Sequence, residues 1–108
     1  MAYYLVQASY TSEAWAAQVA NPQNRLEQLR GVVVGLGGSI NSLYYAFGEY
    51  DILGIMEMPD NVSAAAFALA ASAGGAVKSL KTTPLMTTEE GIEAMRKAGG
   101  AGYRPPGG

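Results

Sequence analysis

The segments at residues 39–47 and 51–58 constrain the fold of this chain most. Each is rich in apolar and aromatic residues and predicts a strand. Gly48-Glu49 between them suits a tight turn, so the two segments predict a hairpin. A strand with one face in water alternates apolar and polar residues. The second segment instead places large apolar side chains on both faces: Ile52, Leu53, Ile55, Met56 and Met58. The predicted sheet therefore needs a cover on each face.

The rest of the chain predicts the order strand, helix, strand, strand, helix, strand around this hairpin. Residues 3–10 predict the first strand and residues 76–83 the fourth. A helical segment precedes the hairpin, because apolar residues recur at helical spacing until Gly37-Gly38. An Ala-rich helix over residues 60–72 follows the hairpin and leads to the last strand.

Polar residues and a proline mark the ends of these helices. Thr11 or Ser12 offers an N-cap for the first helix. Asn21-Pro22 should interrupt that helix, because proline is costly at an interior helical position. Asn21 as cap and Pro22 as the first helical residue would restart it. Asp60 is the expected N-cap of the Ala-rich helix.

The C-terminal part of the chain predicts one more short helix and a tail. Thr87 followed by Glu90 has the spacing of a capping box, which opens a helix through Met95. The last residues are rich in Gly and Pro and have no periodicity, so we expect them to be flexible. The chain of 108 residues thus predicts one domain over residues 1–98 and a tail over residues 99–108.

The element order predicts a ferredoxin-like α+β fold, with a four-stranded antiparallel sheet and both long helices on one face. The other apolar face would then expose several hundred Å2, by a rough estimate, which is more than monomers usually leave bare. A second copy of the chain is the simplest cover, because twofold symmetry makes one patch self-complementary. We therefore expect a homodimer or a higher even multimer, paired face to face as a dimeric α+β barrel. The space between the two sheets is the expected ligand site.

The composition excludes several kinds of chemistry. The chain has no Cys and no His, which excludes thiolate nucleophiles, Ser-His-Asp triads, ordinary zinc sites and haem ligated by His or Cys. We expect neither a metal nor a cofactor. A net charge of −2 with scattered basic residues argues against nucleic acid as a partner. No apolar run approaches the ~20 residues of a membrane span, and the start does not look like a signal peptide, so we expect a cytoplasmic protein.

Residues 44–51 resemble the signature of the GYD domain family, which is named after a Gly-x-Tyr-Asp run present here as Gly48, Tyr50 and Asp51. Other landmarks agree in their order along the chain: Asn21-Pro22 with Arg25, Gly37-Gly38, Pro59-Asp60, and a Val-Lys-x-x-Lys strand. The resemblance runs from about residue 3 to residue 95. It implies a place in the dimeric α+β barrel superfamily, which includes cofactor-independent monooxygenases, lactone isomerases, a haem-binding branch and ligand-sensing domains. It implies no particular reaction for this chain.

Tyr50 and Asp51 are the candidate catalytic residues. Asp51 could act as a general base and Tyr50 as a proton donor at the mouth of the space between the sheets. The structural alternative, which we expect, has Gly48 forming the turn, Tyr50 packing over the hairpin and Asp51 binding turn amides.

Tyrosines cluster on the first two strands, which we expect to be neighbours in the sheet. Their hydroxyls could line a cavity for an aromatic or polyketide-like ligand, or the rings could simply be core and interface residues with a hydrogen-bonding tip. A lysine inside a covered strand also needs a partner or a ligand. The candidate ligand-binding residues are therefore Tyr3, Tyr10, Tyr44, Tyr45 and Lys81.

Two functions of different classes remain open from the sequence. The first is a small-molecule-binding barrel, with or without cofactor-independent catalysis on an aromatic or carbonyl ligand. The alternative is a non-catalytic assembly or regulatory module whose only functional surface is the dimer face.

Overall fold

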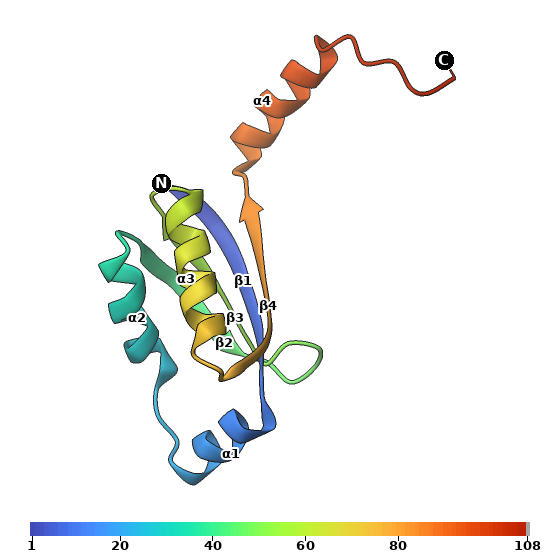
Figure 1. Cartoon of the computed structure of the whole chain (residues 1–108). Helices are drawn as coiled ribbons and strands as arrows, with labels where there is room; N and C mark the ends of the chain where they lie inside the picture. The colour runs from blue at the N-terminus through green and yellow to red at the C-terminus, as the bar shows by residue number, and fades with distance from the viewer. Residues whose placement is uncertain (108) are drawn as a thin grey trace.

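The computed structural model describes residues 1–107 and has a ferredoxin-like α+β fold (Figure 1). Two helices lie over one face of a single four-stranded sheet, and the sheet is open. The elements in chain order are β1 (Ala2–Tyr10), α1 (Ser12–Ala20), α2 (Arg25–Gly35), β2 (Ser39–Tyr45), β3 (Ile52–Met58), α3 (Asn61–Ala73), β4 (Val77–Leu85) and α4 (Thr88–Gly99). The fold expected from the sequence is confirmed.

The strands lie in the order β2-β3-β1-β4, and all neighbours are antiparallel. The expectation that the first two strands are sheet neighbours is wrong, because β3 lies between β1 and β2. The hairpin explains this order. β3 pairs with β2 on one side, and its other edge is left free to pair with β1.

The helix boundaries follow the polar residues seen in the sequence, with one shift. Thr11 caps α1 and Asp60 caps α3, as expected. The first helix breaks at Asn21-Pro22, as expected, but it does not restart there. Asn24 is the N-cap of α2 instead, because its Oδ1 accepts a hydrogen bond from the Leu26 amide at 3.0 Å.

The connection from β2 to β3 is longer than the predicted tight turn. It spans residues 46–51, and the Ala46 amide donates to the Asp51 carbonyl at 2.8 Å to close it. The loop does not stand free of the sheet, because the Asp51 amide also donates to the Ala8 carbonyl at 2.9 Å. This contact extends the β3 pairing and anchors the loop to β1.

Side chains alternate between two faces of the sheet, as the two-residue period of a strand requires. On β3, Ile52, Met56 and Met58 are buried beneath the helices, while Leu53 and Ile55 on the opposite face are only half-buried. The core therefore lies between the sheet and the helices. Its main cluster joins residues of the two central strands to α2 and α3: Tyr4, Val6, Val33, Met56, Met58, Ala64 and Phe67.

The face of the sheet away from the helices is called here the open face. The registers place Leu5 beside Ile55 in its centre, and Tyr3 beside Leu85 at one end. Its apolar and aromatic members come from all four strands: Tyr3, Leu5, Tyr44, Leu53, Ile55 and Leu85. Polar residues lie among them, with Gln7 beside Leu53, Glu57 beside Tyr3 and Thr83 beside Leu5. Lys81 lies on the edge strand β4.

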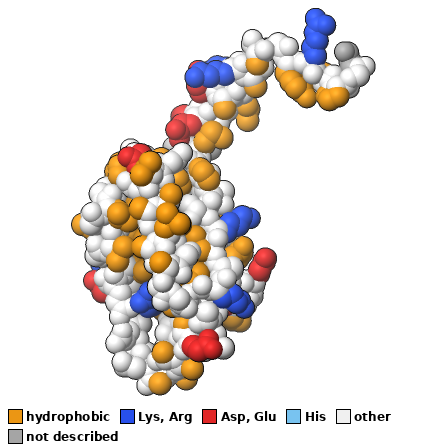
Figure 2. Space-filling view, in the orientation of Figure 1, with side chains coloured by type: hydrophobic (Ala, Val, Ile, Leu, Met, Phe, Trp, Pro, Cys, Tyr) orange, Lys and Arg blue, Asp and Glu red, His pale blue; other side chains and the backbone are white. Residues whose placement is uncertain are grey.

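The C-terminal helix α4 projects away from the body of the domain (Figure 1), which contributes to overall dimensions of 59 × 32 × 22 Å. Its expected capping box is confirmed, with Thr87 and Glu90 bonded to each other's backbone amides. Hydrophobic side chains including Ile92 and Met95 are exposed along one flank, and charged side chains lie along the other (Figure 2). Within residues 1–107, no helix is long and apolar enough to cross a membrane.

Candidate functional site

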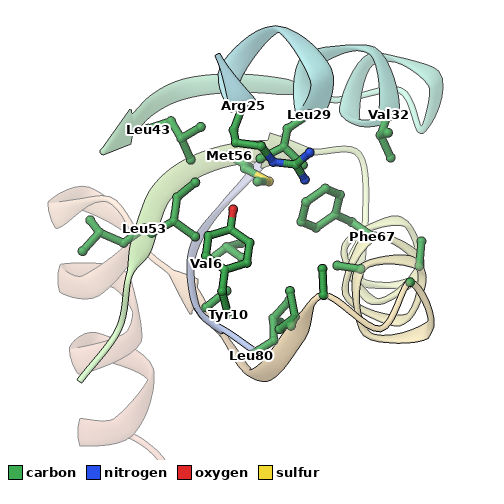
Figure 3. Close-up of a pocket in the computed structure, with 17 residues that line it drawn as sticks. Val6, Tyr10, Arg25, Leu29, Val32, Leu43, Leu53, Met56, Phe67 and Leu80 are labelled. Carbon is green, nitrogen blue, oxygen red and sulfur yellow. The ribbon is translucent and has the colours of Figure 1, made fainter. Parts of the chain in front are cut away.

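A cavity of about 340 Å3 lies between the helix-covered face of the sheet, α2 and α3 (Figure 3), and it opens to the surface, because Val32, Ala70 and Gly74 in its wall are exposed. Most of its wall is apolar. The strands contribute Val6, Ala8, Tyr10, Leu43, Ile52, Leu53, Met56, Val77 and Leu80, and the helices and the α3–β4 turn contribute Arg25, Leu29, Val32, Phe67, Ala70, Ala71, Gly74 and Ala76. Leu53 borders the cavity from β3, although the register assigns its side chain to the open face. This is the concave, mostly apolar kind of space that binds small molecules in proteins.

Small residues keep this space empty. Ala70 and Ala71 line it from the C-terminal half of α3, Gly74 from the C-cap of that helix, and Ala8 from β1. None of these side chains extends beyond Cβ, so the helix and the sheet face each other across a gap that a leucine at any of the alanine positions would reach into. The Ala-rich composition of α3 thus explains the cavity as well as the helix.

Arg25 and Tyr10 are the polar side chains of the cavity that Figure 3 shows pointing into it, from α2 and β1 respectively. Arg25 is half-buried, and its Nε is buried with no hydrogen-bond partner among the described residues. One of its Nη atoms donates to Gln28 Oε1, one turn further along α2. The cavity therefore contains one fixed positive charge, because an arginine stays protonated in proteins.

A second cavity of about 290 Å3 adjoins the first and lies between α1 and α2. The two cavities share Tyr10, Arg25 and Ala76 in their walls. The wall of the second is more polar, with amide side chains at Gln18, Asn21, Gln23 and Gln28. Arg25 thus lies where the apolar first cavity meets the more polar second cavity.

An aromatic cluster of Tyr10, Trp15 and Tyr45 lies beside this boundary. Trp15 contacts Tyr10 edge-on, with ring centroids 5.3 Å apart, and Tyr45 at 6.4 Å. Burial raises the pKa of the Tyr45 phenol, the neighbouring Tyr10 raises it further, and Arg25 lowers it. The phenol of Tyr45 therefore stays neutral at physiological pH.

Asp51 connects three elements at the base of this cluster. Its Oδ2 accepts hydrogen bonds from the Tyr10 amide at 2.9 Å and from Trp15 Nε1 at 3.1 Å. The same loop is held a second time, because Ser9 Oγ donates to the Glu49 carbonyl at 2.9 Å. Asp51 thus fixes the indole of α1 against the end of β1.

The candidate residues from the sequence divide between two faces of the sheet. Tyr10 lines the cavity and Tyr45 lies beside it, on the helix-covered side. Tyr3, Tyr44 and Lys81 lie on the open face. The structure therefore does not bring the five candidates together in one site.

Arg25 is the functional candidate that the site reasoning missed. It occurs in the sequence only as a landmark beside the helix break, and its position as the first residue of α2 was not expected. A basic residue directly after an Asn N-cap is the signal that could have drawn attention to it, because the helix dipole disfavours a positive charge there.

Comparison with known families shows which family this chain belongs to. The model of the GYD domain family matches residues 4–95. The chain belongs to the GYD domain family. Among curated proteins, no relative with significant similarity is found. In this GYD domain, the naming residues Gly48, Tyr50 and Asp51 form the β2–β3 loop, and Asp51 uses its carboxylate to attach that loop to β1 and α1.

Proposed function

We propose that this GYD domain binds a small apolar or aromatic molecule in the cavity beneath α2 and α3. The observation that carries the proposal is the cavity itself, about 340 Å3 of mostly apolar space that opens to the surface between α2 and α3. Small-molecule sites are typically concave, mostly apolar pockets of this size. A ligand seated there would remove the apolar wall from water, which is favourable.

The proposed ligand space differs from the one suggested by the sequence. The sequence predicts a ligand between the sheets of two subunits, whereas this cavity lies within one chain on the opposite side of the sheet. Cofactor-independent catalysis would require a free base beside the ligand. Asp51 is engaged at Oδ2 by two donors, and it does not line either cavity. Binding is therefore the function we propose.

We further propose that the domain works as a homodimer paired through the open face. Leu5, Leu53 and Ile55 lie together there, and neither α2 nor α3 covers them. Contiguous apolar surface of this kind usually marks a protein contact, and a twofold axis would pair it with itself. Pairing two open faces would create the α+β barrel, with one cavity on the outer side of each sheet.

Titration with a neutral fluorescent probe, N-phenyl-1-naphthylamine, tests the binding proposal. We expect saturable emission enhancement with the wild-type domain. Ala71→Leu should fill part of the cavity and weaken binding by roughly tenfold, because its side chain would occupy ligand space. Ala73→Leu, on the same helix but outside the cavity wall, is the matched control and should bind like wild type. Absence of saturable binding to the wild-type domain, or equal weakening in both variants, would contradict the proposal and favour a pure assembly module.

A further inference from the structure

The environment of Arg25 is unfavourable in the absence of a ligand. Its guanidinium lies at the first position of α2, where the helix dipole disfavours a cation. Its Nε is buried without an acceptor, although the side chain as a whole is half-buried and one Nη donates to Gln28. A buried polar atom without a hydrogen bond is costly. Arg25 is the single charged residue among the described residues that line either cavity, so no carboxylate balances it there. An anion bound beside Arg25 would supply the acceptor that Nε lacks.

The surroundings indicate what kind of molecule would carry that anion. On one side of Arg25 lies the apolar cavity, walled by residues such as Leu29 and Phe67. On the other side lies the amide-rich cavity, walled by Gln18 and Gln23. A ligand that fits both sides has an apolar body and a charged end, joined at the level of Arg25.

We infer that this domain binds an apolar monocarboxylate, an aryl or acyl acid, with its carboxylate on Arg25 and its body in the apolar cavity. The inference rests on the proposed function and specifies its ligand class. One guanidinium without a second cation matches one negative charge, which favours a carboxylate over a multiply charged phosphate ester. Hydrogen bonds between guanidinium and carboxylate are charge-assisted and strong. The Tyr10 hydroxyl, which points into the same cavity (Figure 3), is positioned as a second donor.

Calorimetric titration of the wild-type domain with 2-naphthoate and with 2-naphthamide tests the inference. The two probes share one apolar body and differ in the charge of the head group. We expect 2-naphthoate to bind at least roughly tenfold more tightly, because a hydrogen bond to a charged group is worth more than a neutral one. This comparison needs no variant, so it does not depend on the folding of a mutant.

Two variants test whether Arg25 is the source of the preference for the acid over the amide. Arg25→Met keeps an unbranched side chain without charge, and it should bind both probes with similar affinity. Arg30→Met is the matched control on the same helix, because Arg30 is exposed and paired with Glu27 at 2.8 Å. It should keep the preference of the wild-type domain. Circular dichroism of both variants checks that α2 is intact.

Each outcome distinguishes the two proposals. Equal affinity of the wild-type domain for the acid and the amide would overturn the role of Arg25 while leaving the binding cavity in place. A preference for the acid that survives in Arg25→Met would also overturn it. If neither naphthalene probe nor the neutral fluorescent probe binds to the wild-type domain, the proposed function fails and the inference fails with it.

Discussion

Asp51 has a structural role that its position in the family signature does not reveal. Oδ2 of Asp51 accepts from the Tyr10 amide and from Trp15 Nε1, and Asp51 lines neither cavity. The residue is half-buried and lies where the β2–β3 loop meets β1 and α1. Its geometry is that of a carboxylate that holds a loop, a strand and a helix together.

Substitution of Asp51 should therefore act on stability. We expect Asp51→Ala to lower the free energy of unfolding by about 2–3 kcal/mol, because two donors lose their acceptor. Asp51→Asn should cost less, since its amide oxygen can still accept. Urea denaturation followed by Trp15 fluorescence measures both effects. Glu49→Ala, at an exposed position in the same loop, should stay within about 0.5 kcal/mol of wild type. An Asp51→Ala domain as stable as wild type would contradict this role.

The site was harder to predict than the fold, because it depends on the direction in which individual side chains point. A tyrosine in a strand is recognisable from sequence, but its face depends on the register, and the bulge in β2 between Ile40 and Ser42 changes which residues point toward the helices. That bulge places Leu43 and Tyr45 on the helix-covered side and Tyr44 on the open face. A cavity is the space that several neighbouring elements leave unfilled. The hydrophobic periodicity of a single segment therefore does not predict it.

Among the elements, α3 depends on one charged cap. Asp60 Oδ1 accepts a hydrogen bond from the Ser63 amide at 2.8 Å, and this bond holds the pKa of the Asp60 carboxyl below its usual value. A carboxyl whose pKa is lowered by folding stabilises the native state above its unfolded-state pKa. That contribution disappears as the pH falls through the lower pKa of the folded state.

We expect Asp60→Asn to reduce the dependence of stability on acid pH. An asparagine cap makes the same kind of hydrogen bond but does not titrate, so the variant should lose less stability than wild type between neutral pH and pH values below the usual carboxyl range. Thermal melts monitored by circular dichroism at a series of pH values measure the difference. Identical acid profiles for the two proteins would show that this cap does not contribute to acid sensitivity.

Gly54 shows how closely β2 and β3 approach each other. A Cβ at this position would lie 2.5 Å from the Ser42 carbonyl oxygen and 2.9 Å from Leu43 Cδ1. Gly54→Ala should therefore lower the free energy of unfolding by about 1–3 kcal/mol, because the neighbouring strand must move. Gly31→Ala in α2 meets nothing within 4 Å and should instead stabilise by about 0.5–1 kcal/mol. Chemical denaturation compares the two, and equal effects would contradict this account.

Much at the element scale followed from the sequence. Thr11, Asp60 and Thr87 began helices where their chemistry predicted, because capping is a local interaction. Two details were wrong because they depend on longer-range contacts. The β2–β3 turn is extended by its hydrogen bonds to β1, and β3 separates β1 from β2 because the sheet order is set by how the strands pair in three dimensions.

At the scale of the whole molecule, the proposed dimer can be tested by placing a charge in the open face. Leu5 lies beside Ile55 and Thr83 in the centre of that face, so Leu5→Glu should convert the dimer to a monomer, because unpaired charges are costly to bury. Val62→Glu, at an exposed apolar position on α3, is the matched control and should remain dimeric. Native mass spectrometry and light scattering measure the assembly. A wild-type monomer would contradict the dimer.

The strand β1 serves two purposes with alternate residues. Val6 and Ala8 line the cavity, while Leu5 and Gln7 lie on the open face. Loss or gain of one residue within this strand would exchange the two sets, so that the wall of the cavity would present Leu5 and Gln7 and the outer surface would present Val6. Insertions and deletions in natural variants of β1 should therefore be confined to its ends. We expect the length of β1 to vary less among related chains than the identity of any one of its side chains.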